Sequence, residues 1–170
     1  MTKDELKKNL FTGRTNVFAL LDGASVKDLR MQLYKTDAPN YCLFRGELAP
    51  DVAEAAPYLV GLLRDSPFTE WLLSEGLGNH WGVLALSRQS ITEMRRQFRS
   101  LITVYDETGR PMIFRYYDPR VLRNFLPTCN ADELKTFFGK VDTFFAEEAD
   151  GKGMSTYELV DNELKVTLLD

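Results

Sequence analysis

The feature that most constrains the fold is the nearly continuous apolar run of residues 16–21, NVFALL, which ends at Asp22-Gly23. A short apolar run without strict alternation is typical of a strand that is buried on both faces, as in a sheet covered by helices. The Asp-Gly pair predicts a turn, because the Asp side chain can bond nearby backbone N–H groups. We therefore expect a sheet with helices packed on it.

Strand-like and helix-like segments alternate after this run. Further strands are expected at residues 41–44, 58–63 and 80–86. Helices are expected around 26–33, with Ser25 as N-cap, around 51–56, after the cap Ser66-Pro67, and after Ser90, where Glu93 completes a capping box. The last of these helices carries a basic edge, expected to be solvated, made of Arg95, Arg96 and Arg99. This order indicates an α/β layered domain.

Residues 111–129 combine a predicted strand with a helix start and a helix stop. Residues 102–105 and 112–116 flank the turn sequence DETGRP, which predicts an antiparallel hairpin. Asp118-Pro119 fits an N-cap and first helical position, because the carboxylate accepts from exposed N–H groups and proline has none to leave unpaired.

The C-terminal part predicts one more helix and a last hairpin. The helix follows Asn130, and its apolar stripe consists of Leu134, Phe137, Phe138, Val141, Phe144 and Phe145. The hairpin joins residues 156–160 and 164–168. The whole pattern predicts a single α/β layered domain with a mixed, partly parallel sheet flanked by helices, plus a C-terminal β-hairpin. We divide it into a polar lead-in at 1–15, the domain proper at 16–149 and a hairpin extension at 150–170.

Composition narrows the functional class. The 170 residues carry a net charge of −4 with a pI near 5.2, so a nucleic-acid binder, which needs excess Lys and Arg, is not expected. No apolar run approaches the roughly 20 residues that cross a bilayer, and the charged N-terminal segment lacks a signal-peptide core. We expect a cytoplasmic protein without membrane contact, with reduced, buried thiols at Cys42 and Cys129.

No catalytic arrangement stands out, and no cofactor or metal is expected. The motifs GxGxxG and GxxxxGK[ST] are absent, and one histidine cannot build a His-based zinc cluster. Asp22 ends a strand, so either a ligand role or a turn role is open to it. His80 is expected to be structural or hydrogen-bonding, and Trp81 to pack in the core or at its rim. Carboxylates such as Glu147 are expected to be solvated rather than paired for acid–base catalysis.

Three arginines, Arg45, Arg115 and Arg120, have no explanation in local structure. The planar guanidinium suits carboxylate partners and is enriched at interfaces, so internal ion pairing and contact with a partner protein are equally weighted. Tyr117 presents the same choice, because its polar tip needs a partner. The carboxylates considered for internal pairing are Asp22, Glu47 and Asp118.

Six blocks of sequence occur in the order of a known family. They are FALLDGA (18–24), YCLFRGEL (41–48), APYLVGL (56–62), SPFTEWLLSEGLGNHWGV (66–83), MIFRYYDPRVLRNFLPTC (112–129) and LKTFFGKVDTFFAE (134–147). This order resembles the bacterial type VI secretion adaptor family, also called effector chaperones (Tap or TEC proteins), a family classed as a domain of unknown function. The resemblance runs from about Val17 to Glu148.

The resemblance implies a non-catalytic cytoplasmic protein that holds a cognate secreted effector and loads it onto the VgrG spike protein. Its members look to carry a longer C-terminal lobe in many cases, whereas only the hairpin follows here. The motif positions that we take as partner-binding candidates are Asp22, Arg45, His80, Trp81, Arg115, Tyr117, Asp118 and Arg120. The main alternative is a small-molecule-binding or hydrolytic α/β domain that uses Asp22 and His80 at strand ends.

Overall fold

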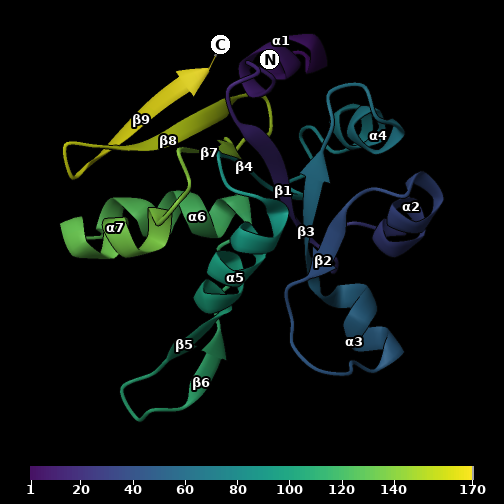
Figure 1. The fold of residues 1–170 in the computed structure, drawn as a ribbon. Helices are drawn as coiled ribbons and strands as arrows, with labels where there is room; N and C mark the ends of the chain where they lie inside the picture. The colour runs from purple at the N-terminus through teal and green to yellow at the C-terminus, as the bar shows by residue number, and fades with distance from the viewer. Residues whose placement is uncertain (170) are drawn as a thin grey trace.

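The computed structural model describes residues 1–169, and seven of its strands form one sheet in the order β2-β3-β1-β4-β7-β8-β9. The strands are β1 (Asn16–Asp22), β2 (Asn40–Cys42), β3 (Pro57–Leu62), β4 (Gly82–Ser87), β7 (Thr143–Glu147), β8 (Met154–Val160) and β9 (Glu163–Leu169). In Figure 1 they run from β9 on the left to β2 on the right. The last two continue the sheet that the earlier strands begin.

Every neighbouring pair in this sheet is antiparallel, so the predicted partly parallel sheet is wrong. The helix α2 (Leu29–Thr36) joins β1 to β2, and α4 (Pro67–Glu75) joins β3 to β4. The two strands of each pair do run in the same direction, as strand–helix alternation predicts. An antiparallel strand lies between them in both cases, namely β3 in the first and β1 in the second.

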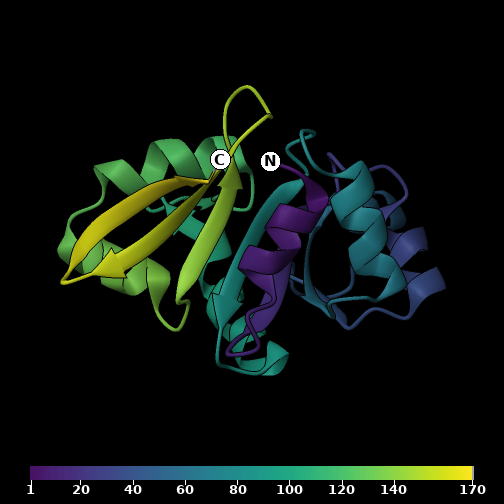
Figure 2. The ribbon, with the colours of Figure 1, turned by 90° about the horizontal axis from the view of Figure 1, so that it is seen from above.

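Helices cover both faces of the sheet. One face packs against α2, α4 and the N-terminal helix α1 (Lys3–Leu10), whose Leu6 and Leu10 are fully buried. The other face packs against α5 (Ile91–Ile102), α6 (Pro119–Phe125) and α7 (Ala131–Phe138). Figure 2 shows α1 in purple across the strands in front and the green helices behind the yellow strands β8 and β9. The short helix α3 (Pro50–Ala55) has no buried residue.

The strand β1 is the centre of this arrangement. Val17, Ala19 and Leu21 point into the α1/α2/α4 side, and Phe18 and Leu20 point into the other. From Val17 to Asp22 every residue is buried, which confirms that the apolar run is a strand covered on both faces.

A separate two-stranded hairpin, β5 (Thr103–Tyr105) and β6 (Pro111–Ile113), projects from the domain below α5 in Figure 1. The predicted hairpin is confirmed, but β6 ends at Ile113 instead of Tyr116. The chain then turns, with the Asp118 N–H donating to the Arg115 carbonyl oxygen at 3.0 Å. Tyr116 is fully buried, and its hydroxyl donates to the Phe98 carbonyl oxygen at 2.8 Å.

The helix predicted after Asn130, with an apolar stripe that reaches Phe145, is too long. Asn130 and Glu133 do form the capping box, but α7 ends at Phe138 because Gly139 adopts φ +51°. A Cβ at this position would lie 2.6 Å from Gln97 Nε2. Residues 143–147 are the strand β7, in which every residue is buried. Residues 141, 144 and 145 have the three- and four-residue spacing of a helical stripe, although none of them belongs to a helix.

The local signals at most element ends are confirmed. Ser66 and Ser90 cap α4 and α5, and Asp161-Asn162 turn the last hairpin with φ of 50° and 67°. Cys42 and Cys129 are free and partly buried. A short 3₁₀ helix, η1 (Leu126–Thr128), follows α6. Over residues 1–169, no helix has the length and apolar character needed to cross a membrane.

Candidate functional site

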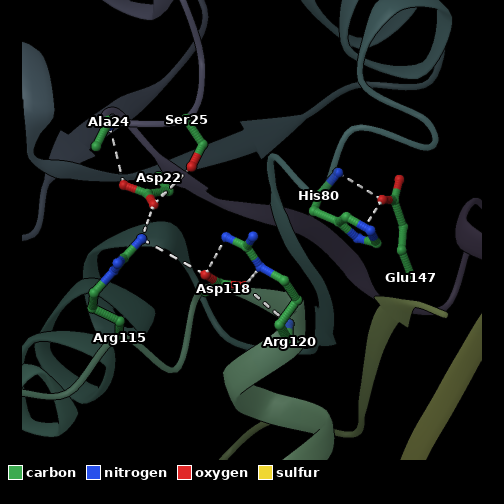
Figure 3. Close-up of polar contacts among 8 residues, drawn as sticks. All are labelled: Asp22, Ala24, Ser25, His80, Arg115, Asp118, Arg120 and Glu147. Atoms are coloured by element: carbon green, nitrogen blue, oxygen red, sulfur yellow. Dashed lines mark hydrogen bonds and ion pairs between the residues drawn. The ribbon is translucent and has the colours of Figure 1, made fainter. Parts of the chain in front are cut away.

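Four of the candidate residues form a chain of ion pairs at the C-terminal end of β1 (Figure 3). Arg115 Nη2 lies 2.6 Å from Asp22 Oδ2 and 3.6 Å from Asp118 Oδ2. Arg120 donates from Nε and Nη2 to the two Asp118 carboxylate oxygens, at 2.9 and 2.8 Å. Both arginines are therefore paired internally, while their side chains stay 47% and 55% exposed. Their outer faces remain open to a partner.

Asp22 is the most buried member of this chain, with a side chain 2% exposed. Besides Arg115, it accepts hydrogen bonds from the Ala24 N–H at 3.1 Å and the Ser25 hydroxyl at 3.0 Å. The turn role predicted for Asp22 is confirmed. The predicted N-cap role of Ser25 is wrong, because its hydroxyl is used here and α2 begins only at Leu29.

Asp118 combines two structural roles. It is the N-cap of α6, accepting from the Arg120 N–H at 2.9 Å, and it pairs with the Arg120 guanidinium. Burial alone would raise the pKa of Asp118, but the hydrogen bonds from Arg120 outweigh it, and the pKa is lowered. Burial raises the pKa of the neighbouring Tyr117, with a further contribution from the charge of Asp22. Tyr117 is 3% exposed, so its ring is part of the core.

His80 lies in the loop before β4 and faces Glu147 at the end of β7 (Figure 3). Glu147 accepts from the backbone N–H groups of Gly78 at 2.7 Å and His80 at 2.8 Å. His80 Nδ1 is 3.1 Å from Glu147 Oε2, but it has no partner in hydrogen-bonding geometry. The carboxylate thus holds the 78–80 loop, where His80 adopts φ +53°.

Trp81 and Arg45 lie outside both groups. Trp81 packs against the Trp71 ring, with 5.2 Å between the ring centroids. It is partly buried at the rim of the core, which agrees with the packing role predicted for it. Its carbonyl oxygen accepts from the Asp22 N–H at 2.9 Å and so joins the start of β4 to the end of β1. Arg45 is exposed beside the arginines of α5 and makes no ion pair with any residue of 1–169.

The sheet end therefore holds two buried carboxylates, Asp22 and Glu147, at the ends of parallel strands on either side of β4. Each is occupied by N–H, O–H or guanidinium donors from its own chain. In the part of the chain that the structure describes, His80 has no hydrogen bond to a Ser, Thr or Cys side chain. That part also contains no cluster of three His, Cys, Asp or Glu side chains suited to a metal ion. The contacts of these two carboxylates join the end of β1 to Arg115 and the end of β7 to the 78–80 loop.

Three residues of interest were misjudged from the sequence. Glu147 was expected to be solvated, but it is 5% exposed because it belongs to the unpredicted strand β7. Arg95 and Arg99 were assigned to a solvated edge, but both are partly buried. The sequence did offer a signal for β7. The short apolar run FFA (144–146) follows Gly139, a residue that commonly ends a helix.

Comparison with known proteins gives one match. A family model described as a domain of unknown function, DUF4123, matches residues 17–136. This span begins at β1 and ends within α7, so it includes the ion-pair chain, the β5–β6 hairpin and the arginines of α5. No curated protein and no solved structure matches the chain.

Proposed function

Since the chain belongs to the DUF4123 family, we propose that it is a non-catalytic adaptor that binds a cognate type VI secretion effector in the cytoplasm and loads it onto the VgrG spike. The six collinear sequence blocks support this proposal, because they carry the resemblance to effector chaperones. Most of these blocks lie inside the matched span.

The observation that carries a binding function is the exposed apolar hairpin β5–β6. All six of its strand residues are exposed, among them Tyr105 at 69%, Met112 at 48% and Ile113 at 58%. A two-stranded hairpin is at best marginally stable in water, and exposed apolar patches mark interaction sites. An open hollow of about 370 Å³ lies at its base, lined in part by Phe114, Phe125 and Phe137. A partner segment that covers the hairpin can place an apolar side chain there.

The hydrolytic alternative has less support. It requires Asp22 or His80 to reach a substrate, and the contacts of Asp22 are taken up by Arg115, Ala24 and Ser25. His80 faces a carboxylate and no nucleophile.

The proposal is tested by purifying the tagged full chain from its source cell under native conditions and identifying bound proteins by mass spectrometry. We expect a protein with a toxin domain and VgrG. The variant Met112→Ser/Ile113→Ser should lose at least one of them, because it removes apolar surface from the hairpin.

A matched control is Met31→Ser/Leu63→Ser, which removes two apolar side chains of similar exposure, 52% and 65%, away from the hairpin. This variant should retain both proteins. Recovery of neither protein by the unmodified chain, with neighbouring genes unrelated to secretion, would refute the proposed function. Equal loss in the two variants would refute the role of the hairpin.

A further inference from the structure

Four arginines converge beside the edge strand β2. Arg95, Arg96 and Arg99 come from one stripe of α5, and Arg45 comes from the loop after β2. Together with Thr92 they line a hollow of about 440 Å³. Within residues 1–169 none of the four arginines forms an ion pair. This grouping is unusual in a chain with a net charge of −4.

The protein holds two of these guanidinium groups in place at a cost. Arg99 donates from Nη2 to the carbonyl oxygens of Cys42 at 2.7 Å and Phe44 at 3.1 Å, and Arg95 lies 4.5 Å from the centre of the Tyr41 ring. The Nε atoms of both arginines are buried without a hydrogen-bond partner. Burial, and next the charge of Arg95, lowers the pKa of Arg99. Like charges held together in this way gain stability from a bound anion.

The arginine hollow continues into a longer groove along the edge of the sheet. This groove, about 870 Å³ in volume, shares Arg95 and Arg99 with the hollow, and its lining extends past β2 to residues of α2. Its walls include the 85% exposed Tyr34, with Phe44 and Leu48. Among residues 1–169, the only acidic one that lines it is Asp37. The groove therefore combines basic side chains from α5 and α2 with the apolar side chains of Phe44 and Leu48 and the exposed Tyr34, beside the edge strand β2.

We propose that the arginine hollow and the β2 groove bind an acidic, extended segment of a partner protein. Carboxylates of the segment pair with the guanidinium groups of Arg45, Arg95 and Arg96, whose planar donors match a carboxylate. Its apolar side chains lie against Tyr34, Phe44 and Leu48 along the groove, and its backbone runs beside the edge strand β2, where Arg99 already binds the Cys42 carbonyl oxygen. This proposal does not depend on the proposed function, because it names a ligand chemistry and not a secretion step.

A peptide fits these features better than a nucleic acid does. A polynucleotide needs excess basic residues along its whole path, whereas the basic residues of this groove share it with Asp37, and Arg30 is already paired with Glu54, in a protein of net charge −4. The side chains of Tyr34, Phe44 and Leu48 near β2 suit a polypeptide with alternating side chains.

The test uses the full chain and a fluorescein-labelled peptide of alternating Glu and Val residues, with fluorescence anisotropy as the readout at low and physiological ionic strength. Wild type should bind the Glu-Val peptide saturably and the Gln-Val peptide not at all. Arg45→Gln/Arg96→Gln should weaken binding at least about tenfold, because both side chains are exposed and lose only the contact to the ligand.

The control Arg14→Gln/Arg88→Gln makes the same change in net charge at exposed positions elsewhere, and it should change affinity by no more than about twofold. Equal affinity for the Glu and Gln peptides, equal weakening in the two double variants, or no binding of the Glu peptide at low salt would overturn the proposal. Tighter binding of a thymidine oligonucleotide than of the Glu peptide, lost in Arg45→Gln/Arg96→Gln, would assign the hollow to phosphates and likewise overturn it.

Discussion

The Oδ2 atom of Asp22 lies 2.6 Å from Arg115 Nη2, although 93 positions separate the two residues. The pair ties the end of the central strand β1 to the turn that precedes α6. Asp22 is buried and Arg115 is half exposed, so the carboxylate depends on this contact more than the guanidinium does. Of the two roles considered for Arg115, internal ion pairing and contact with a partner protein, the structure shows the first.

We predict that Asp22→Asn and Arg115→Met are each destabilising and strongly coupled. Arg115→Met leaves the buried Asp22 without a charged partner, Asp22→Asn leaves Arg115 with only its longer contact to Asp118, and the double variant removes both charges. A double-mutant cycle in urea should give a coupling of about 1–2 kcal/mol. The free energies of unfolding at neutral pH measure it, and strictly additive single effects would contradict the pairing.

Asp118→Asn should cost about 1 kcal/mol at pH 6, because Asn retains the N-cap but loses the charge that Arg120 pairs with. The pKa of folded Asp118 is lowered from the ordinary value of 3.8, so its stabilising contribution is fully present above that value. It is lost as pH falls through the folded pKa. The difference in unfolding free energy between wild type and variant should therefore shrink below about pH 3.8 and stay constant above about pH 5.

Glu147→Gln should loosen the 78–80 loop. The carboxylate gives one oxygen to the Gly78 N–H and the other to the His80 N–H, whereas an amide offers only one acceptor oxygen. We expect a loss of about 1–3 kcal/mol and faster hydrogen exchange at these two amides. The exposed Glu75 provides the control, since Glu75→Gln should change neither quantity.

Gly139→Ala should be more harmful than Gly13→Ala. Both glycines have positive φ, but a Cβ at Gly13 meets nothing within 4 Å, whereas one at Gly139 meets the Gln97 amide. Gln97 bonds the Phe138 carbonyl oxygen at 2.7 Å and the Lys140 N–H at 2.9 Å, so both contacts are displaced. We expect about 1 kcal/mol for Gly13→Ala and about 2–3 kcal/mol for Gly139→Ala. Equal thermal unfolding midpoints of the two variants would show that the Gln97 contacts contribute nothing.

Local chemistry explains what could be predicted from the sequence. The caps at Ser66, Ser90 and Asn130 each join residues three apart in the sequence. The apolar run of β1 predicts a buried strand by itself, without knowledge of the neighbouring strands. These signals fixed most helices and strands and the α/β class. The turn role of Asp22 could be predicted for the same reason, since its carboxylate oxygens accept hydrogen bonds from residues two and three positions later in the chain.

What could not be predicted depends on contacts between distant segments. The direction of neighbouring strands follows from β1 lying between β3 and β4, and no local pattern records that order. Gln97 of α5 lies against Gly139, the residue at which α7 ends. Asp22 and Arg115, like Glu147 and His80, become partners only through the sheet. The sequence alone therefore left internal pairing and partner contact equally weighted.

The strand order also sets a sequence of events during synthesis. The block β2-β3-β1-β4 is complete once residue 87 has left the ribosome, but the next partner of β4 is β7, which begins at Thr143. Until then β4 is an unpaired edge, and the sheet face that receives α5, α6 and α7 is covered only as these helices are made. Nascent chains in this state are prone to wrong associations. The interval between residues 88 and 142 is thus when this protein itself most needs protection from other chains.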